Sequence, residues 1–325
     1  MPKPLVVWTN HKFPEHLSNE LRRQIGGAEL VLAQSMASSN LTAAGADPGL
    51  ATADIAFGQP DPAQVMNSPG VRWVHLSTAG YTRYDRDDFK AAIKGRGGAF
   101  TTSSAVFADP CAQHVLAMML ACARQLPAAW ANQQNVRGWP YLEARVNSHL
   151  LTGQRVLILG FGAIARRLVD LLRPFDCEMI ATRRTVKGNE PIGVVPVDQT
   201  DDLLPDADHV VNILPASDET RHFLNAARFA RLKRTAILYN IGRGDTVDQD
   251  ALVSALNNRQ LAAAYLDVTS PEPLPPEHPL WAAPNCFITP HTAGGHANES
   301  ARLLEHFLDN FRRFISGGTM RDRIV

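Results

Sequence analysis

The sequence predicts an α/β protein whose parallel sheets are doubly wound, with helices on both faces of each sheet. Short continuous apolar runs alternate with polar, helix-compatible segments along most of the chain. Strands buried on both faces have this apolar character, and parallel strands need crossover connections that are usually helical. The other two observations behind the prediction are a glycine-rich turn directly after one apolar run and an amphipathic segment near the C-terminus.

Two series of apolar runs predict two sheets, and the 325-residue chain is long enough for two domains. The first series predicts strands at residues 5–8, 28–32, 55–58 and 72–76. The second series predicts strands at residues 155–159, 178–182, 209–214, 235–241, 262–268 and 286–289. Strands that alternate with helices in this way are typical of Rossmann-like domains.

Two helices are expected to define the domain boundaries. Residues 109–124 are almost wholly apolar and begin with Asp109 as N-cap and Pro110 at the first helical position, which predicts a buried linking helix. Residues 298–315 carry one apolar face, and this helix should return to the first domain. We therefore expect one domain at residues 1–104 and 296–325, and a second at residues 105–295.

The segment at residues 125–147 contains Trp130, Trp139 and Tyr141 without a clear helical or strand period. Aromatic residues in an irregular surface segment indicate a contact arm. Packing of the same residues onto their own domain is the alternative, and the sequence leaves both open.

Charge and cysteine content exclude some classes of protein. Lysine plus arginine and aspartate plus glutamate both number 32, so no excess positive charge attracts nucleic acid or anionic membrane. The four cysteines lie far apart, and neither CxxC pairs nor HExxH are present, so we expect no disulfide framework and no metal. The apolar N-terminal run has four residues and no other run approaches the length needed to span a membrane, which predicts a soluble cytoplasmic protein.

A G-x-G-x-x-A turn follows the apolar run at residues 156–159. Gly160 allows the tight turn, Gly162 lets the backbone approach a pyrophosphate, and Ala165 is small enough for helix–strand packing. The amides of Ala163 and Ile164 should then face the phosphates at the helix N-terminus. The sequence therefore predicts a dinucleotide site.

The next strand ends in Arg183 and Arg184, where an acidic residue usually binds the adenosine ribose hydroxyls. Arginines offer positive charge and planar donors to a 2′-phosphate, so we predict a preference for NADP(H). The alternative is that both arginines are solvated turn residues and that NAD(H) is used.

Three stretches at predicted strand ends complete the pattern: YNIGRGDTVD at residues 239–248, LDVTSPEPLP at 266–275 and ITPHTAGGH at 288–296. With LTGQRVLILGFGAIA and ILPASDETRHFLN, in the same order, they make the chain similar to the D-isomer-specific 2-hydroxyacid dehydrogenases. The resemblance covers nearly the whole chain. It implies that residues 105–295 bind the dinucleotide, that the other domain binds substrate, and that the protein is a homodimer.

The resemblance also implies the roles of the site residues. Arg243 should bind the carboxylate and carbonyl oxygen of a 2-oxo acid, and His291 should act as general acid in reduction. Glu272 should orient the imidazole and keep a proton available on it. Asp267 should hold the nicotinamide carboxamide. Further cofactor contacts are expected at Phe161, Pro215, Ile241, Gly242 and Gly294, and the amides of Ala79 and Gly80 should meet the substrate carboxylate.

The leading hypothesis is an NADP-dependent reductase of a small 2-oxo acid such as glyoxylate or hydroxypyruvate. A cofactor-sensing interaction protein similar to the C-terminal-binding corepressors is an alternative, because those proteins keep the equivalents of Arg243, Glu272 and His291. A phosphite dehydrogenase of the same family is another, because it retains the equivalent of Glu272.

Overall fold

The structure is a computed structural model that describes residues 3–36 and 45–325. It divides into two compact units, unit 1 at residues 1–107 and 295–325 and unit 2 at residues 108–294. The boundaries expected from the sequence, 104/105 and 295/296, fall close to these positions. The cofactor turn and the residues Arg243, Glu272 and His291 all belong to unit 2.

Unit 1 contains a parallel five-stranded sheet with the order β2-β1-β3-β4-β5. This 2-1-3-4-5 order is that of a doubly wound sheet, in which the strand order reverses beside the first strand. The strands are β1 (Val6–Thr9), β2 (Glu29–Leu32), β3 (Ile55–Gly58), β4 (Trp73–Leu76) and β5 (Ala99–Thr101). Its helices are α1 (Glu15–Gln24), α2 (Pro62–Met66), α3 (Asp87–Gly95) and the C-terminal α11 (Glu299–Ser316).

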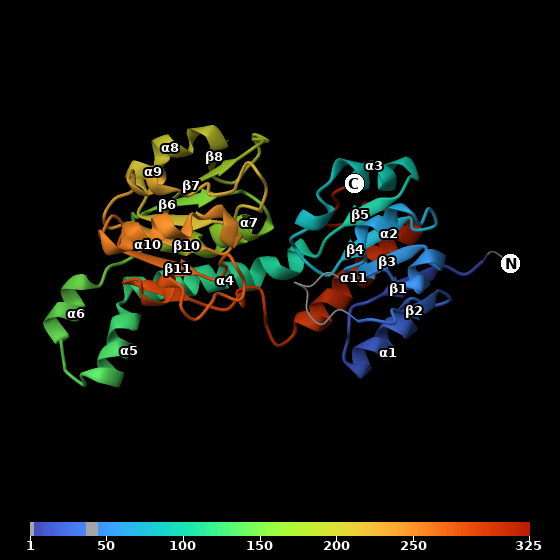
Figure 1. The fold of residues 1–325 in the computed structure, drawn as a ribbon, viewed down its shortest axis with the longest axis horizontal. Helices are drawn as coiled ribbons and strands as arrows, with labels where there is room; N and C mark the ends of the chain where they lie inside the picture. Colours follow the sequence, from blue (N-terminus) through green and yellow to red (C-terminus); the bar gives the residue numbers. More distant parts are fainter. Residues whose placement is uncertain (1–2, 37–44) are drawn as a thin grey trace. The chain divides into compact units, whose positions relative to one another are not determined.

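The C-terminal helix returns to unit 1, as the sequence predicts. In Figure 1, α11 is drawn in red among the blue elements of this unit. Its Phe307 is fully buried and stacks on Phe57 and Trp73, with ring centroids 4.3 and 5.2 Å apart. Stacked aromatic rings bury large apolar areas, so the helix completes the core on one face of the sheet.

Unit 2 contains a parallel seven-stranded sheet with the order β12-β11-β10-β9-β6-β7-β8. Counted from β6, the first six strands follow the Rossmann order 3-2-1-4-5-6. The strands are β6 (Arg155–Leu159), β7 (Glu178–Arg183), β8 (Gly193–Pro196), β9 (His209–Asn212), β10 (Ile237–Asn240), β11 (Ala263–Leu266) and β12 (Cys286–Ile288). Its helices are α5 (Leu126–Asn135), α6 (Tyr141–Asn147), α7 (Ala163–Leu172), α8 (Thr200–Leu203), α9 (Ala226–Phe229) and α10 (Gln249–Asn257).

The linking helix α4 (Ser104–Ala123) differs from the prediction, because it starts five residues earlier and Pro110 lies inside it. The amide of Ala105 in its first turn donates to the Asp322 carboxylate, 2.7 Å away, so its start is capped from the far end of the chain. Asp109, expected as the N-cap, instead pairs with Arg167. The helix is also only partly buried, with Val115 and Met119 covered and Gln113 exposed.

By length and composition, α4 is apolar enough to cross a membrane, and it is the one helix in the described ranges that meets both criteria. The expectation that no segment has such a length was therefore wrong. Most of its side chains are at least partly covered by the chain itself.

The segment predicted to be irregular, residues 125–147, forms the two short helices α5 and α6 instead. Neither helix buries a residue, which explains why no apolar stripe marks them in the sequence. In Figure 1 these green helices stand away from the sheet of unit 2. Exposed side chains include Val146 and Leu142 on α6 and Trp139 between the two helices. We call residues 124–148 the arm.

The buried His209 should make the stability of unit 2 depend on pH. Its ring contacts the Tyr239 hydroxyl and Gln154, and burial lowers its pKa to about 4, with Asp208 opposing the shift and His149 adding to it. The unfolded chain, with an ordinary histidine pKa of about 6.5, binds more protons between pH 6.5 and 4. The free energy of unfolding should therefore fall as pH drops through this window, by up to about 1.4 kcal/mol per pH unit from this group.

Urea denaturation between pH 7.5 and 4.5 measures this slope. The His209→Asn variant should show a shallower slope than the unchanged protein. His222, also in unit 2 but exposed, is the control, and His222→Asn should leave the slope as it is. Equal slopes for all three proteins would contradict the assignment to His209.

Candidate active site

The glycine turn after β6 has the backbone geometry of a dinucleotide site. Gly160 has a φ of +94°, and a side chain there would come within 3.2 Å of the Ile213 carbonyl oxygen, so glycine is required. Around the Cβ position of Gly162 the space is open, with no atom within 4 Å. Gly162 is also the N-cap of α7, and no side chain caps this helix. The first-turn amides are thus left for an anion, and the turn fits the pyrophosphate of a dinucleotide.

Ala165, the residue in place of a third glycine, is fully buried on α7. This agrees with its expected part in close packing between helix and sheet. Phe161 is also buried, whereas Ala163 and Ile164 lie in the first turn of α7.

The two arginines after β7 differ from each other. The Arg183 side chain is 20% exposed, and its Nη1 donates to Oε1 of Glu190, 3.0 Å away. The Arg184 side chain is 84% exposed and lies 3.6 Å from the exposed Glu219. The interpretation of both as solvated residues therefore fails for Arg183. Glu190 was missed by the sequence analysis, because the loop between β7 and β8 must fold back to bring it to Arg183.

His291 and Glu272 form a hydrogen-bonded pair. His291 Nδ1 lies 2.7 Å from Glu272 Oε2, and Glu272 Oε1 accepts from the amide of Thr269 at 3.1 Å. Burial tends to raise the pKa of Glu272, but its contacts with His291, the Thr269 amide and Arg243 outweigh that effect and lower it. The carboxylate is therefore ionised at neutral pH and fixes the orientation of the imidazole.

His291 has a left-handed backbone, with a φ of +53°, which is uncommon for residues other than glycine. Its amide donates to the Asp267 carbonyl oxygen at 2.8 Å. The Asp267 carboxylate accepts hydrogen bonds from the Thr289 hydroxyl at 2.6 Å, the Thr292 amide at 2.8 Å and the Ala293 amide at 3.0 Å. Asp267 thus holds the loop that carries His291, a role that sequence analysis did not assign. Its contact with nicotinamide stays a prediction.

Arg243 follows β10, and the next residue, Gly244, packs closely against the loop that carries Glu272. A side chain on Gly244 would lie 1.9 Å from the Thr269 carbonyl oxygen, so only glycine permits this approach. The Arg243 carbonyl accepts from Asn240 and Thr246, and Nη1 donates to the Gly242 carbonyl at 2.6 Å. Burial lowers the pKa of Arg243 and Glu272 opposes this shift. An arginine remains protonated in such surroundings, so the site keeps its cation.

The remaining predicted cofactor residues follow other strands of the same sheet. Pro215 comes after β9, Ile241 and Gly242 directly after β10, and Gly294 after β12. Strands β9, β10 and β12 are parallel to β6, so these residues share the carboxyl edge with the glycine turn. Gly242 also permits close packing, because a Cβ there would lie 2.6 Å from the Leu214 carbonyl oxygen.

A small pocket lies at this edge, and Ile241, Asp267 and Thr289 are among the residues that line it. His114 also lines it, and its Nε2 lies 3.3 Å from the Thr289 hydroxyl. His114 was interpreted from the sequence only as part of the linking helix.

Ala79 and Gly80 lie in unit 1, in the loop after β4. Thr78 Oγ1 donates to the Gly80 carbonyl at 2.7 Å, and Gln59 Nε2 donates to Ser77 and Thr78. These bonds fix the loop within its own unit. The contact of the Ala79 and Gly80 amides with the substrate carboxylate stays a prediction.

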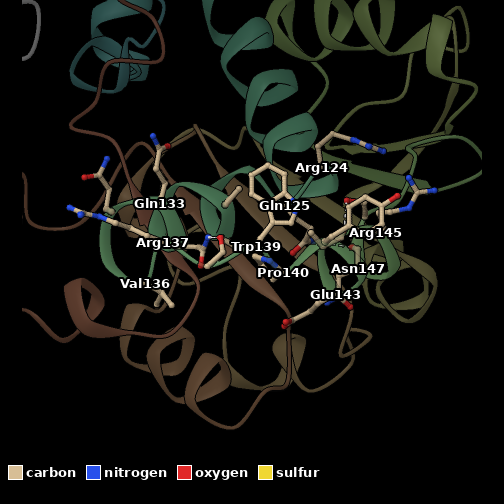
Figure 2. A pocket seen from close by; sticks show the side chains of 18 residues that line it. Arg124, Gln125, Gln133, Val136, Arg137, Trp139, Pro140, Glu143, Arg145 and Asn147 are labelled. Carbon is tan, nitrogen blue, oxygen red and sulfur yellow. Dashed lines mark hydrogen bonds between the residues drawn. The ribbon is translucent and has the colours of Figure 1, made fainter.

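The broad hollow in Figure 2 is a different feature. It is lined by residues of the arm, including the labelled Arg124, Trp139 and Arg145. None of the proposed catalytic residues lines it. Among the described residues, no cluster of three or more histidine, cysteine, aspartate or glutamate side chains is placed to hold a metal.

Comparison with known proteins identifies the relatives of the chain. Residues 116–293 match the family model described as D-isomer specific 2-hydroxyacid dehydrogenase, NAD binding domain. A glyoxylate reductase of Aeropyrum pernix is 32% identical over 262 residues, which cover 78% of this chain and 76% of that protein. A glyoxylate/hydroxypyruvate reductase B of Escherichia fergusonii is 30% identical over 265 residues, or 79% of each chain.

Solved structures agree with this result. The D-isomer specific 2-hydroxyacid dehydrogenase of Xanthobacter autotrophicus, in complex with NADPH and MES, superimposes with a TM-score of 0.79. It is 26% identical and covers 99% of this chain and 98% of its own. The chain therefore belongs to the D-isomer specific 2-hydroxyacid dehydrogenase family, whose members are NAD(P)-dependent oxidoreductases.

Proposed function

We propose that the chain is an NADP(H)-dependent reductase of a small 2-oxo acid of the glyoxylate or hydroxypyruvate type. The observation that carries this proposal is the pair of His291 and Glu272 at 2.7 Å, with Arg243 on an adjoining loop of the same sheet edge. The names of the reductases from Aeropyrum pernix and Escherichia fergusonii support the substrate class. The NADPH complex of the Xanthobacter autotrophicus enzyme supports the cofactor.

In the proposed reaction, Arg243 binds the substrate carboxylate and directs a second donor to the carbonyl oxygen at C2. A nicotinamide cofactor, when bound at the glycine turn, would supply the hydride that C2 receives. Negative charge then develops on the carbonyl oxygen, where the fixed guanidinium stabilises it without reorganisation. The residue is held for this task by the hydrogen bonds of its own carbonyl to Asn240 and Thr246.

His291 completes the reduction by donating a proton to that oxygen. Glu272 occupies Nδ1 of the ring, so Nε2 is the nitrogen that exchanges the proton with substrate. In the oxidative direction the same nitrogen accepts the proton from the hydroxyl group. Arg243 and His291 are thus the catalytic residues, and Glu272 and Asp267 position the imidazole.

Replacement of Arg243 tests this assignment. Arg243→Ala should lower kcat/KM for the 2-oxo acid by about 10³-fold, because charge stabilisation and substrate binding are both lost. His291→Ala should cost about 10²-fold. Arg234, exposed at the other end of β10, is a matched control, and Arg234→Ala should stay within about twofold. Near-normal turnover in Arg243→Ala would refute the assignment.

A substrate panel tests the activity itself. NADPH and NADH oxidation should be followed with glyoxylate, hydroxypyruvate and pyruvate, and phosphite oxidation should be measured beside them. We expect turnover of at least one of the small 2-oxo acids and a higher kcat/KM for NADPH than for NADH. A tenfold preference for NADH would overturn the cofactor proposal, and no turnover of any compound would overturn the enzymatic one.

We also propose a homodimer formed through the linking helix α4 and the arm, as the family resemblance implies. Trp139 is 91% exposed and Val146 is 81% exposed, which is unusual for large apolar side chains. Light scattering after gel filtration should give twice the chain mass, and Trp139→Glu should shift the protein toward monomer. Trp281, exposed but outside the arm, is the control. A monomeric unchanged protein would contradict the proposal.

A further inference from the structure

A buried carboxylate, that of Glu190, lies beside the end of β7. The usual pattern of a dinucleotide site has its acidic residue at the end of the strand itself, at position 183. An acidic residue at position 183 would accept hydrogen bonds from the adenosine ribose and repel a 2′-phosphate. In this chain position 183 is arginine, and the carboxylate that contacts it belongs to Glu190, seven residues later. The Glu190 side chain is only 3% exposed, and its Oε1 lies 3.0 Å from Arg183 Nη1.

The Glu190 carboxylate is held in place by the loop itself. Its Oε1 also accepts a hydrogen bond from the Lys187 amide at 2.9 Å. That bond lowers the pKa of Glu190; burial opposes the shift, and its own amide, Arg183 and the Gly188 amide lower it further. The carboxylate is therefore ionised at neutral pH, and it cannot leave Arg183 without breaking several hydrogen bonds.

Arg184 provides a contrast within the same turn. Its side chain is 84% exposed, and its neighbour Glu219 is 76% exposed at 3.6 Å. Such a pair is weak and screened by salt, so Arg184 is free to turn toward a ligand. Arg183 is already paired, although within the described ranges its other guanidinium nitrogens have no hydrogen-bond partner.

We propose that Glu190 is a specificity-determining residue that limits the preference for NADPH over NADH. Its carboxylate keeps a fixed negative charge beside the Arg183 guanidinium, and so weakens the positive potential that a 2′-phosphate would meet. Because it is covered, it does not replace the missing acid as a partner of the ribose hydroxyls. This inference rests on the cofactor site proposed above and concerns how strongly that site discriminates.

The experiment compares two nucleotide fragments that differ at the ribose. Binding of 2′,5′-ADP and of 5′-AMP should be measured by calorimetry for the unchanged protein and for Glu190→Gln. Glutamine keeps an oxygen that accepts from the Lys187 amide and Arg183, but it removes the charge. We expect 2′,5′-ADP to bind about tenfold more tightly to the variant, and 5′-AMP to change by less than about twofold.

Glu219→Gln is the matched control, because it removes an exposed carboxylate beside the other arginine. Its effect on either fragment should stay within about twofold. The gain in Glu190→Gln should also shrink as salt rises from 50 to 500 mM, as expected for an interaction between charges.

Three results would overturn the inference. Unchanged or weaker binding of 2′,5′-ADP by Glu190→Gln would show that the carboxylate does not oppose the phosphate. An equal change for both fragments would show a general effect on the loop. Failure of the unchanged protein and the variant to bind either fragment would reject the site itself.

The same data separate this inference from the proposed NADP(H) preference. The ratio of the two affinities in the unchanged protein tests the preference, and the change of that ratio in Glu190→Gln tests the role of Glu190. If the unchanged protein binds 5′-AMP more tightly and Glu190→Gln shifts the ratio toward 2′,5′-ADP, the proposed NADP(H) preference is overturned. The proposed role of Glu190 then stands.

Discussion

The hydrogen bonds of the Asp267 carboxylate are the constraint on which the proposed catalytic geometry depends. Asp267 directly follows β11 and is 4% exposed. Its carboxylate accepts hydrogen bonds from three groups of the segment after β12. A buried carboxylate without such donors would be costly, so the two strand ends are stabilised together. The His291 amide is bonded to the same residue, which maintains its left-handed backbone.

A second constraint joins the Arg243 loop to the Glu272 loop. Gly244 has no room for a side chain against the Thr269 carbonyl, and the Thr269 amide in turn donates to Glu272. Gln249 adds two hydrogen bonds to the backbone of Ser270, with its Oε1 accepting from the Ser270 amide at 2.9 Å. Contacts between strand ends therefore position the loops that carry the cation, the carboxylate and the imidazole, and the side-chain pair of Glu272 and His291 then orients the imidazole.

The sequence predicted those features that local pattern determines. Apolar runs located every described strand except β5 and β8, which were not predicted. The strand ends and the family motifs located Arg243, Glu272 and His291. Contacts between residues distant along the chain were not accessible in this way. The start of α4 depends on Asp322, more than two hundred residues away, and Glu190 reaches Arg183 only because the loop after β7 folds back. The arm helices were missed because they bury no side chain in the chain itself, and burial is what produces a readable period.

The same arrangement of charges occurs at both ends of the proposed cofactor site, with different consequences. Glu272 and Glu190 are each ionised, each accept a backbone amide, and each pair with a basic side chain. The partner of Glu272 is an imidazole, whose second ring nitrogen can donate or accept a proton, so this pair can support chemistry. The partner of Glu190 is a guanidinium, which does not lose its proton in proteins, so this pair can only change the field that a ligand meets. The identity of the base beside each carboxylate thus separates a catalytic function from a selective one.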